Sequence, residues 1–550
     1  MPETSPQSAP PSQFLPKIVT VLREGYSRSD LRADALAGLT VAIVALPLSM
    51  AIAIASGVGP ERGLFTAIVG GFLVSALGGS RYQIGGPAGA FIVLVSACMA
   101  ANGIDGLILA TFLSGFLMLA AGALRLGTYI RFIPYPVTVG FTAGIAVIIF
   151  ASQIKDLFGL TLEHAEPAEI IHKIETLWAA RATVTPAAVG VALGTIVMIE
   201  AIKRLRPHWP SLLIAIVIAS AVVAVAGLPV MTIGSKFGEL PRVLPMPALP
   251  VINKESLLAA LPFAVSFTLL GAIESLLSAV VADGMSGRQH RSNAELVAQG
   301  FANIGSALFG GFCVTGTIAR TATNVRAGSR GPVSGMLHAL FVLAFMMVAA
   351  PLAAYIPLAA LAGLLAIVAW NMAEKEEFWS LVRSSRGDAV VVIVTFLLVV
   401  FRDLTEGIIV GFALGGLVFI SRMSEAAEIA PHAHKGRYDA GLVAGDVVVY
   451  RLSGAYFFGA AARLGSILDR IADHPRGFVL DFEDVPFIDS SGARSFELLA
   501  HKVKRKGGAL YLTGTTSEQR RVLLAQGVRE PLVHYLPDID TAVEVARSAA

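Results

Sequence analysis

The sequence predicts an all-α polytopic membrane domain of about fourteen spans, followed by a small soluble α/β domain. Hydrophobic residues make up 55% of the 550 residues and charged residues only 15%. The mean hydropathy of +0.71 is well above that of soluble globular proteins. The apolar excess is confined to residues 33–424, and two of the apolar segments are short and open with helix-breaking residues.

The composition along the chain also predicts the order of the domains and argues against some classes of partner. We expect a cytosolic N-terminal segment over 1–32, a transmembrane domain over 33–424, a linker over 425–439 and a soluble domain over 440–550. The first segment lacks the apolar core and cleavage site of a signal peptide. A net charge of +3 without a basic tract argues against nucleic acid. Cys98 and Cys313 fall in apolar segments, so we expect no disulfide framework, no metal site and no cofactor.

Each predicted span is a run of about 20 apolar residues, the length that crosses about 30 Å of hydrocarbon. The spans lie near 34–56, 62–79, 85–100, 105–124, 132–152, 184–202 and 210–228 in the first half, and near 258–282, 294–312, 316–327, 332–355, 356–372, 387–401 and 405–423 in the second. Arginine and lysine gather in alternate short loops, as at Arg125, Lys203 and Arg288. The positive-inside rule then predicts a bacterial inner-membrane protein with both termini in the cytoplasm.

The third span of each half is too short to cross the membrane. In the first half an apolar run to about Met99 follows Gly85-Gly86-Pro87-Ala88-Gly89-Ala90-Phe91, and proline suits the first turn of a helix. A helix of about 12 residues is about 18 Å long, so its N-terminus would lie near the bilayer midplane. The second half repeats the device with Cys313-Val314-Thr315-Gly316-Thr317-Ile318-Ala319-Arg320-Thr321, and Gly328 ends the segment.

The two short segments are counterparts in a repeat. Because each half contains seven spans, an odd number, the second half must be inverted relative to the first. The N-termini of the half-helices then face each other, and their free N–H groups and dipoles form a site for an anion. The alternative is that both segments are merely kinked or interfacial helices. Their matched positions favour the anion site.

Two ionisable residues fall at membrane depth near these segments, Glu274 in the eighth span and Arg320 in the second half-helix. Charged groups are costly there and mark a pathway or an ion pair. The alternatives are a structural pair between them, a snorkelling Arg320, or a protonated Glu274 that is hydrogen-bonded in the bundle. Asp283 is expected at the membrane edge. His338 is given no role, because a lone histidine in a bundle usually packs or makes a structural hydrogen bond.

Two long stretches carry a family resemblance. The region from Pro47 to Pro87 includes PLSMAIAIASGVGPERGLFTA and overlaps GGSRYQIGGPAGA, and the region from Leu270 to Ile304 reads LGAIESLLSAVVADGMSGRQHRSNAELVAQGFANI. The first resembles the signature of the sulfate permease (SulP) family, also called solute carrier family 26. The second is similar to the branch that includes the bacterial aerobic C4-dicarboxylate transporter.

The resemblance implies a core domain from spans 1–4 and 8–11, a gate domain from spans 5–7 and 12–14, and an elevator-like movement of one against the other. It implies that Glu274 is the ion-coupling carboxylate, for a proton or alternatively sodium, and that the protein is a homodimer. It also implies a substrate site lined by Gly86, Ala88, Gly89, Ala90, Ala319, Arg320 and Thr321.

One departure from the family bears on the substrate. Many sulfate-transporting members have Gln directly after the proline of the first span and often Tyr four residues beyond it, whereas this chain has Leu48 and Ile52. A polar contact to the substrate is thereby missing. The dicarboxylate-like branch also tolerates Leu there, which favours succinate- or fumarate-like anions. Sulfate, bicarbonate and chloride remain open.

The soluble tail alternates predicted strands and helices. Strand-like runs begin at Val447 and cover 477–482 and 509–513, and helix-like runs cover 460–471 and 491–504. The motif Asp489-Ser490-Ser491-Gly492 resembles the loop of the sulfate transporter and anti-sigma factor antagonist (STAS) domain. In the soluble regulators a serine of that loop is phosphorylated, so Ser490 and Ser491 are candidate regulatory sites. The alternative is that one of them simply caps the helix.

Together these patterns predict a secondary active anion transporter and not an enzyme. Protonation of Glu274 would remove its repulsion of the anion, which favours proton–anion symport. A sodium-coupled bicarbonate transporter, an uncoupled exchanger or channel, and a sensor that signals through the C-terminal domain are the alternatives. A channel needs no coupling group, so the presence of Glu274 favours coupled transport.

Overall fold

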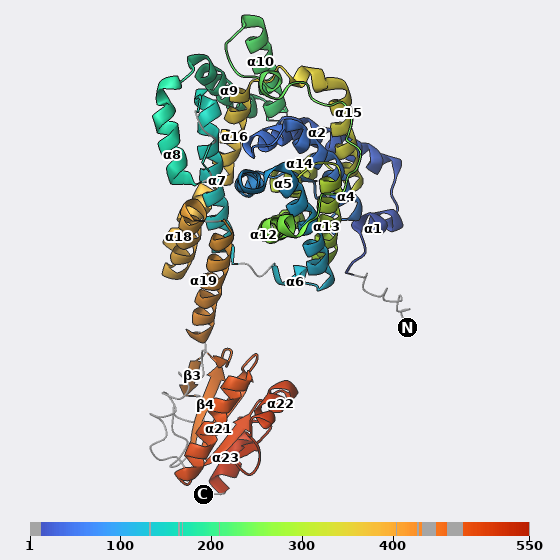
Figure 1. The fold of residues 1–550 in the computed structure, drawn as a ribbon. Coiled ribbons are helices and arrows are strands. Elements are labelled where there is room, and N and C mark those ends of the chain that lie inside the picture. Colours follow the sequence, from blue (N-terminus) through green and yellow to red (C-terminus); the bar gives the residue numbers. More distant parts are fainter. Residues whose placement is uncertain are drawn as a thin grey trace. The chain divides into compact units, whose positions relative to one another are not determined.

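The computed structural model describes residues 13–130, 134–162, 166–167, 169–207, 209–402, 404–425, 428–431, 447–458 and 477–548. The chain divides into two compact units after Phe412. The described part of the first unit is almost entirely helical, whereas the second is built around a five-stranded sheet (Figure 1). The helix predicted over 460–471 lies outside the described residues.

The helices of the first unit are α1 (Lys17–Glu24), α2 (Arg28–Ala55), α3 (Pro60–Phe65), α4 (Gly71–Leu77), α5 (Ile92–Ala123), α6 (Gly127–Ile130), α7 (Tyr135–Phe158), α8 (Ile170–Ala179), α9 (Pro186–Leu205), α10 (Ser211–Ala226), α11 (Ile233–Phe237), α12 (Lys254–Ser286), α13 (Ser292–Leu308), α14 (Ile318–Arg326), α15 (Val333–Ala353), α16 (Leu358–Met372), α17 (Lys375–Ser384) and α18 (Arg386–Phe401). The division between the two units falls within a further helix, α19 (Leu404–Glu425). The irregular turns are a π-helix η1 (Thr66–Gly70) and the 3₁₀ turns η2 (Gly89–Phe91) and η3 (Ala180–Thr183). Two short strands, β1 (Gly85–Gly86) and β2 (Thr315–Gly316), pair with each other.

Every predicted span corresponds to helix, which confirms the all-helical polytopic class. The second span is formed by α3, η1 and α4 in succession, and the third and fourth are joined in α5 across a break at Gly103, where φ is 66° and ψ is −168°. Within the described residues, eight helices are long and apolar enough to cross a membrane. The number of fourteen crossings therefore stays a prediction. The sequence did not predict α8 or α17.

The membrane helices pack in two bundles. One contains α2, α4, α5, α12, α13, α14 and α15, and the other contains α7, α9, α10, α16 and α18 (Figure 1). These are the helices expected in the core and gate domains, except that the fourteenth span, α19, is not part of either group, and we name the two groups the core bundle and the gate bundle. Small residues let the helices approach closely: a methyl group on Gly115 of α5 or on Gly300 of α13 would lie 2.7 Å from the carbonyl oxygen of the other.

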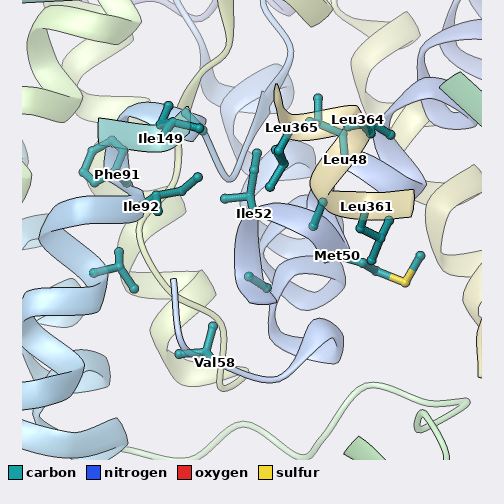
Figure 2. Close-up of a cluster of buried hydrophobic side chains, with 14 of the residues drawn as sticks. Leu48, Met50, Ile52, Val58, Phe91, Ile92, Ile149, Leu361, Leu364 and Leu365 are labelled. Atoms are coloured by element: carbon teal, nitrogen blue, oxygen red, sulfur yellow. The ribbon is translucent and has the colours of Figure 1, made fainter. Parts of the chain in front are cut away.

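The boundary between the two bundles is apolar where α2 and the start of the first half-helix meet α7 and α16. Leu48 and Ile52 of α2 and Phe91 of η2 are buried in one hydrophobic cluster with gate side chains (Figure 2). The gate side chains labelled there are Ile149 of α7 and Leu361, Leu364 and Leu365 of α16. Leu48 and Ile52 therefore contribute hydrocarbon to this core–gate boundary.

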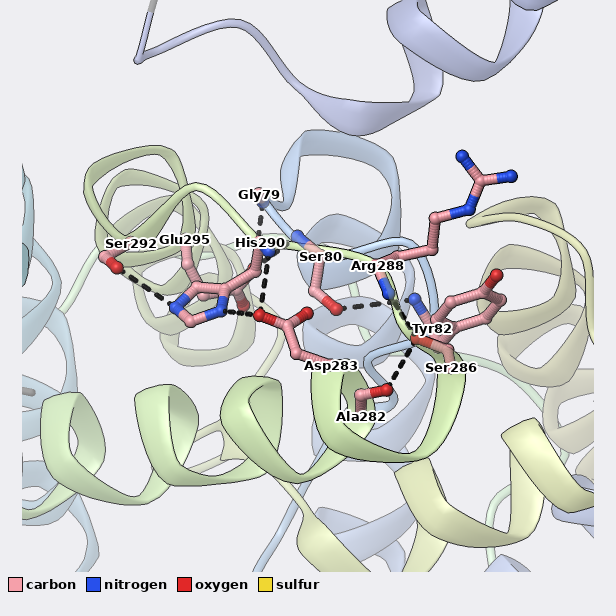
Figure 3. Close-up of polar contacts among 10 residues, drawn as sticks. All are labelled: Gly79, Ser80, Tyr82, Ala282, Asp283, Ser286, Arg288, His290, Ser292 and Glu295. Atoms are coloured by element: carbon pink, nitrogen blue, oxygen red, sulfur yellow. Dashed lines mark hydrogen bonds and ion pairs between the residues drawn. The ribbon is translucent and has the colours of Figure 1, made fainter.

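A buried carboxylate fixes the loop that leads into the first half-helix. Glu295 of α13 is fully buried and accepts hydrogen bonds from the backbone N–H of Gly79 at 2.9 Å and of Ser80 at 3.1 Å. The side-chain amides of Gln83 and Gln299 donate to its other oxygen. Figure 3 shows Glu295 with its loop partners and, beside them, Asp283, which accepts from the His290 ring at 2.6 Å. These contacts tie α12, α13 and the loop after α4 together.

The second unit is a sheet with helices on both faces. Strands β3 (Glu428–Pro431), β4 (Val447–Ser453), β5 (Gly477–Asp484), β6 (Ala509–Thr513) and β7 (Val533–Tyr535) lie in that order, β3 antiparallel and the rest parallel. Helices α21 (Ser490–Arg505), α22 (Ser517–Ala525) and α23 (Ile539–Ser548) complete it. The side chains of α21 and α22 join one buried cluster and those of α23 another. The predicted α/β domain is confirmed, although β3 lies in the segment assigned to the linker.

The four hydrogen bonds to Glu295 predict that Glu295→Gln will destabilise the membrane domain. An amide has only one acceptor oxygen, so two of the four donors would face an NH₂ group. Leaving buried donors unpaired costs about 1–3 kcal/mol. We expect a lower midpoint of thermal unfolding in detergent, followed by intrinsic fluorescence. Glu255→Gln, at an exposed position on α12, is the control, and equal midpoints for the two variants would contradict the role of Glu295.

Candidate anion site

The two interrupted helices meet at a short antiparallel ladder. Gly85 pairs with Gly316 and Gly86 with Thr315, so backbone groups that no helix satisfies find partners inside the apolar bundle. The helical segment that follows β1 runs from Gly89 to the break at Gly103 and is roughly 20 Å long. The one that follows β2 is α14, with 9 residues. Both are too short to cross the membrane, as the sequence predicts.

Neither half-helix has a side-chain cap at its N-terminus. The N-cap positions are Ala88 before η2 and Thr317 before α14, and neither side chain bonds to the first turn. The Thr317 hydroxyl instead donates to the Ile84 carbonyl at 3.1 Å. The first N–H groups of a helix have no partner within it, so these two N-termini present free donors and positive dipole ends.

Arg320 adds a positive side chain at the same place. It is 1% exposed, and its Nη2 donates to the Ser49 hydroxyl at 3.1 Å and to the Pro87 carbonyl at 3.3 Å. Its Nε and Nη1 have no hydrogen-bond partner among the described residues. A methyl group on Gly86 would lie 2.5 Å from Nη1. The guanidinium therefore lies against the start of the first half-helix and keeps N–H groups that have no partner among the described residues.

Glu274 lies on the face of α12 that packs against this crossing. On the same face the Gly271 carbonyl accepts from the Thr315 hydroxyl at 3.2 Å, and Ser275 accepts from the Gly316 N–H at 3.1 Å. Glu274 itself is 6% exposed. Within the described part of the chain it forms no ion pair with Arg320. The alternative of a structural pair between these two residues is therefore not what the structure contains.

The other predicted site residues differ in their surroundings. Ala88 and Ala90 are buried, Gly89 is partly exposed, and Ala319 is exposed at the start of α14. A methyl group on Gly89 would lie 3.3 Å from Ile149, so this residue faces the gate bundle. The Thr321 hydroxyl accepts from the Ile84 N–H at 3.1 Å and from Ser278 at 3.0 Å. The Thr321 hydroxyl thus links the backbone of Ile84 to Ser278 of α12. A contact between Thr321 and the substrate stays a prediction.

Three residues that support the site were missed in the sequence. The Ser49 hydroxyl accepts a hydrogen bond from Arg320, and the Glu295 carboxylate accepts from the loop that leads into the first half-helix. The side chain of Asn303 on α13 accepts from the Val314 N–H at 2.9 Å and donates to the Val314 carbonyl at 3.0 Å. The signal for Glu295 was an ionisable residue at the start of a predicted span. Ser49 and Asn303 were isolated polar residues in apolar runs, which is a weaker signal.

The serine loop of the second unit precedes α21 as predicted, but its cap is different. The Asp489 carboxylate accepts from the Gly492 N–H at 2.7 Å and is the N-cap. Ser490 and Ser491 are the first residues of the helix and are exposed. The alternative in which one of these serines caps the helix is therefore wrong. Regulation by phosphorylation stays a prediction.

Two interrupted helices meet inside a membrane bundle, with uncapped N-termini and a buried arginine, and this architecture is that of an anion transporter. The chain belongs to the sulfate permease family, whose model matches residues 31–395. The STAS domain model matches residues 442–542. The family and the C-terminal domain expected from the sequence are thereby confirmed.

Two relatives illustrate the range of names in this family. The chain is 39% identical over 517 residues to the putative sulfate transporter YvdB of Bacillus subtilis, covering 92% of this chain and 95% of the relative. It is 29% identical over 523 residues to the bicarbonate transporter BicA of Picosynechococcus, covering 90% of each. The chain is an anion transporter of this sulfate and bicarbonate type and not an enzyme. The C4-dicarboxylate branch stays a prediction.

Solved structures share the fold. The murine Slc26a9 anion transporter in its inward-facing state superposes with a TM-score of 0.85 at 20% identity, covering 99% of this chain and 96% of that one. The transmembrane domain of a cyanobacterial bicarbonate transporter BicA superposes with a TM-score of 0.64 at 31% identity, covering 70% of this chain and 98% of that one. The first likeness shows the fold alone.

The contact between Gly86 and Arg320 predicts that Gly86→Ala will impair transport. The added methyl group would displace Nη1, and a lost hydrogen bond to a charged group is worth about tenfold or more in affinity. We expect the apparent KM for the anion to rise by roughly that factor. Gly190→Ala makes the same change on α9, where nothing lies within 4 Å, and should leave KM unchanged. Equal KM values for the two variants would contradict the contact.

Proposed function

We propose that the chain is a secondary active transporter that carries a small oxyanion across the bacterial inner membrane together with one cation at Glu274. The observation that carries this proposal is the buried Arg320 guanidinium, which lies beside two uncapped helix N-termini and has N–H groups without a partner in the described part of the chain. A buried charge with free donors binds an oxygen-bearing anion, because guanidinium matches the geometry of carboxylates and related oxyanions.

Charge balance favours a monovalent substrate. Arg320 supplies one positive charge and an ionised Glu274 one negative charge in an apolar bundle. A bound monovalent anion and one bound cation therefore leave the site neutral, whereas a divalent anion leaves one negative charge uncompensated. Because an uncompensated charge in a low-dielectric interior is costly, we propose bicarbonate as the substrate. The name of the BicA relative supports this choice.

The substrate decides the cation. A bicarbonate ion and a proton together make carbonic acid, which yields carbon dioxide, so cotransport of the two would store no anion gradient. Sodium, held by the Glu274 carboxylate and neighbouring oxygens, is therefore the proposed cation. The second candidate is a proton-coupled C4-dicarboxylate transporter, which the similarity of the stretch from Leu270 to Ile304 favours.

The proposal includes the topology and the movement. Both termini lie in the cytoplasm, as the distribution of arginine and lysine indicates. The core bundle carries the substrate and slides against the gate bundle in a homodimer. The apolar core–gate boundary supports sliding, because the side chains of Leu48, Ile52 and the leucines of α16 meet there through hydrocarbon contacts, which can re-form after a movement.

Uptake by proteoliposomes tests the proposal directly. Labelled bicarbonate, sulfate and succinate are offered in turn under an inward sodium gradient, an inward proton gradient, or neither. Sodium-driven accumulation of bicarbonate supports the proposal, and proton-driven accumulation of succinate supports the second candidate. Movement that only dissipates gradients would identify an uncoupled exchanger or channel and overturn both.

Arg320→Ala should weaken anion binding while the protein stays folded in detergent. Removing the guanidinium deletes the charge-assisted hydrogen bonds to the anion, which are worth about 1.5–3 kcal/mol each, or roughly tenfold to a hundredfold in affinity. Concentration-dependent uptake measures the effect, with Arg402→Ala as the control because that arginine is exposed near the end of α18. An unchanged KM for Arg320→Ala would remove Arg320 from the site.

Glu274→Gln should separate binding from coupling. The amide has nearly the same shape but no charge, so it does not hold sodium and does not repel the anion. We expect loss of gradient-driven accumulation together with preserved exchange of internal for external anion. Glu255→Gln, on the same helix but exposed, should accumulate anion normally. Accumulation by Glu274→Gln at the wild-type level would show that the coupling ion binds elsewhere.

A further inference from the structure

A groove of about 420 Å³ lies between the core bundle and the gate bundle. Its floor is α2, through Leu46, Pro47 and Met50, and its two walls are α10 of the gate bundle and α15 of the core bundle. Among the described residues that line the groove, none belongs to the proposed anion site. The groove therefore needs an explanation of its own.

The two walls are helix faces that pack against the same helix. Both α10 and α15 contact α2, and the lining residues of each recur every three or four positions, which is the spacing of one helix face. On α10 they are Leu213, Ile216, Val217, Ser220, Ala221 and Ala224. On α15 the face includes Met346, Ala349, Ala350 and Ala353. The rim is open, since Val217 is 56% exposed and Leu352 is 70% exposed.

The lining of the groove excludes a polar or charged ligand. Among its described residues none is charged, and only Ser220 and Tyr355 carry a hydroxyl group. The Ser220 hydroxyl already donates to the Ile216 carbonyl at 2.7 Å. A polar molecule that entered would lose its hydration without gaining hydrogen bonds, which is costly. The chemistry of the groove therefore fits a hydrocarbon.

The groove is continuous with the surface that faces the bilayer. Beside its α10 wall, Val222 and Val225 are 51% and 90% exposed, and beside its α15 wall Val348 is 81% exposed. On the apolar helices of a membrane domain, such side chains are covered by lipid tails. The hydrocarbon with direct access to the groove is therefore the lipid of the membrane itself.

The length of the groove matches one lipid tail in one leaflet. Its lining on α10 extends from Leu213 to Ala224, which is roughly 16 Å at the rise of an α-helix. Half of the hydrocarbon thickness of a bilayer is about 15 Å. An extended acyl chain therefore fits along α10 without leaving its own leaflet.

We propose that this groove is a binding site for one acyl chain of a membrane phospholipid, which is retained there as part of the folded protein. Met50 lines the groove and also belongs to the hydrophobic cluster that joins the two bundles, together with Leu361 of α16 (Figure 2). The bound chain thus fills the flank of the core–gate boundary. Because a lipid tail changes its conformation readily, it keeps this flank packed while the core bundle slides, whereas an empty groove would forfeit those contacts.

Native mass spectrometry tests the binding site. The protein is reconstituted with phosphatidylethanolamine and phosphatidylglycerol, extracted in a mild detergent and washed, so that loosely held lipid is removed. The wild type should keep a bound phospholipid. Ala224→Phe puts a phenyl ring into the groove and should lose it. Ala226→Phe, the same change at an exposed position of α10 outside the groove, should keep it.

Two results would overturn the proposal: a wild type without retained phospholipid, or equal retention by the two variants. If Ala224→Phe does not fold, Ala349→Phe takes its place on the opposite wall. Its control is Ala344→Phe, at an exposed position of α15 outside the groove.

Photolabelling locates the retained lipid. A phosphatidylglycerol with a diazirine in the middle of one acyl chain is exchanged into the extracted protein, irradiated and mapped by peptide sequencing. Label on the lining residues of α10 and α15 that disappears in Ala224→Phe supports the proposal, and label only elsewhere overturns it. A second copy of the chain is the other possible occupant. Efficient interchain disulfides of Val217→Cys, at the rim, would assign the groove to that copy and overturn the lipid site.

Uptake measurements separate this inference from the proposed function. We expect Ala224→Phe to lower the maximal rate of anion uptake several-fold without changing KM, and Ala226→Phe to keep both at the wild-type level. Equal maximal rates in the two variants would overturn the role of the lipid in the movement. A wild type that retains the phospholipid but neither binds nor transports bicarbonate or sulfate would overturn the proposed function and leave the lipid site intact.

Discussion

The structure of the membrane domain depends on pairing the backbone groups that are released where two helices stop inside the bundle. A peptide group without a partner in hydrocarbon is costly, and the β1–β2 ladder has only two residues on each side. Side chains on continuous helices complete the pairing. Asn303 binds both polar groups of Val314, Glu295 binds the N–H groups of Gly79 and Ser80, and Ser275 accepts from Gly316. The side chains of the continuous helices α12 and α13 thus supply the hydrogen bonds that fix the two interrupted segments.

This pairing explains why the helix N-termini at the proposed anion site keep free donors. The Thr317 hydroxyl is occupied by the Ile84 carbonyl and the Thr321 hydroxyl by the Ile84 N–H, so neither side chain competes for the first turn of α14. In the second unit the Asp489 carboxylate does occupy the first turn of α21. A capped N-terminus is satisfied by its own chain, whereas the two N-termini at the crossing retain donors for a ligand.

The sequence predicted which segments are helical because the requirement of the bilayer is local. A run of apolar residues in the bilayer has to pair its backbone N–H and C=O groups within its own helix. An interruption by helix-breaking residues at the third span of each half marks where the helix stops and those groups need other partners. The contacts that fix the crossing were not predictable in the same way. Glu295 and its loop are more than 200 residues apart, and Ser49 meets Arg320 only because α2 packs beside α14. Such pairs depend on helix packing, which periodicity does not specify. Helices α8 and α17 are amphipathic and lack the long apolar run by which spans are recognised.

In the proposed mechanism, the apolar core–gate boundary would make transport depend on an accompanying cation. Arg320, Ser49 and Glu274 all belong to the core bundle, so in this proposal a bound anion would make its polar contacts with the moving part, while Ile149 and the leucines of α16 would offer it no polar group. A charge that passes such a surface loses hydration without gaining a partner, and the cost rises with the net charge of the moving site. A core bundle that holds a monovalent anion at Arg320 and a cation at Glu274 passes the boundary as a neutral unit. A core bundle loaded with the anion alone carries one uncompensated charge, so movement without the cation is suppressed, and this difference is the physical basis of coupling in the proposed mechanism.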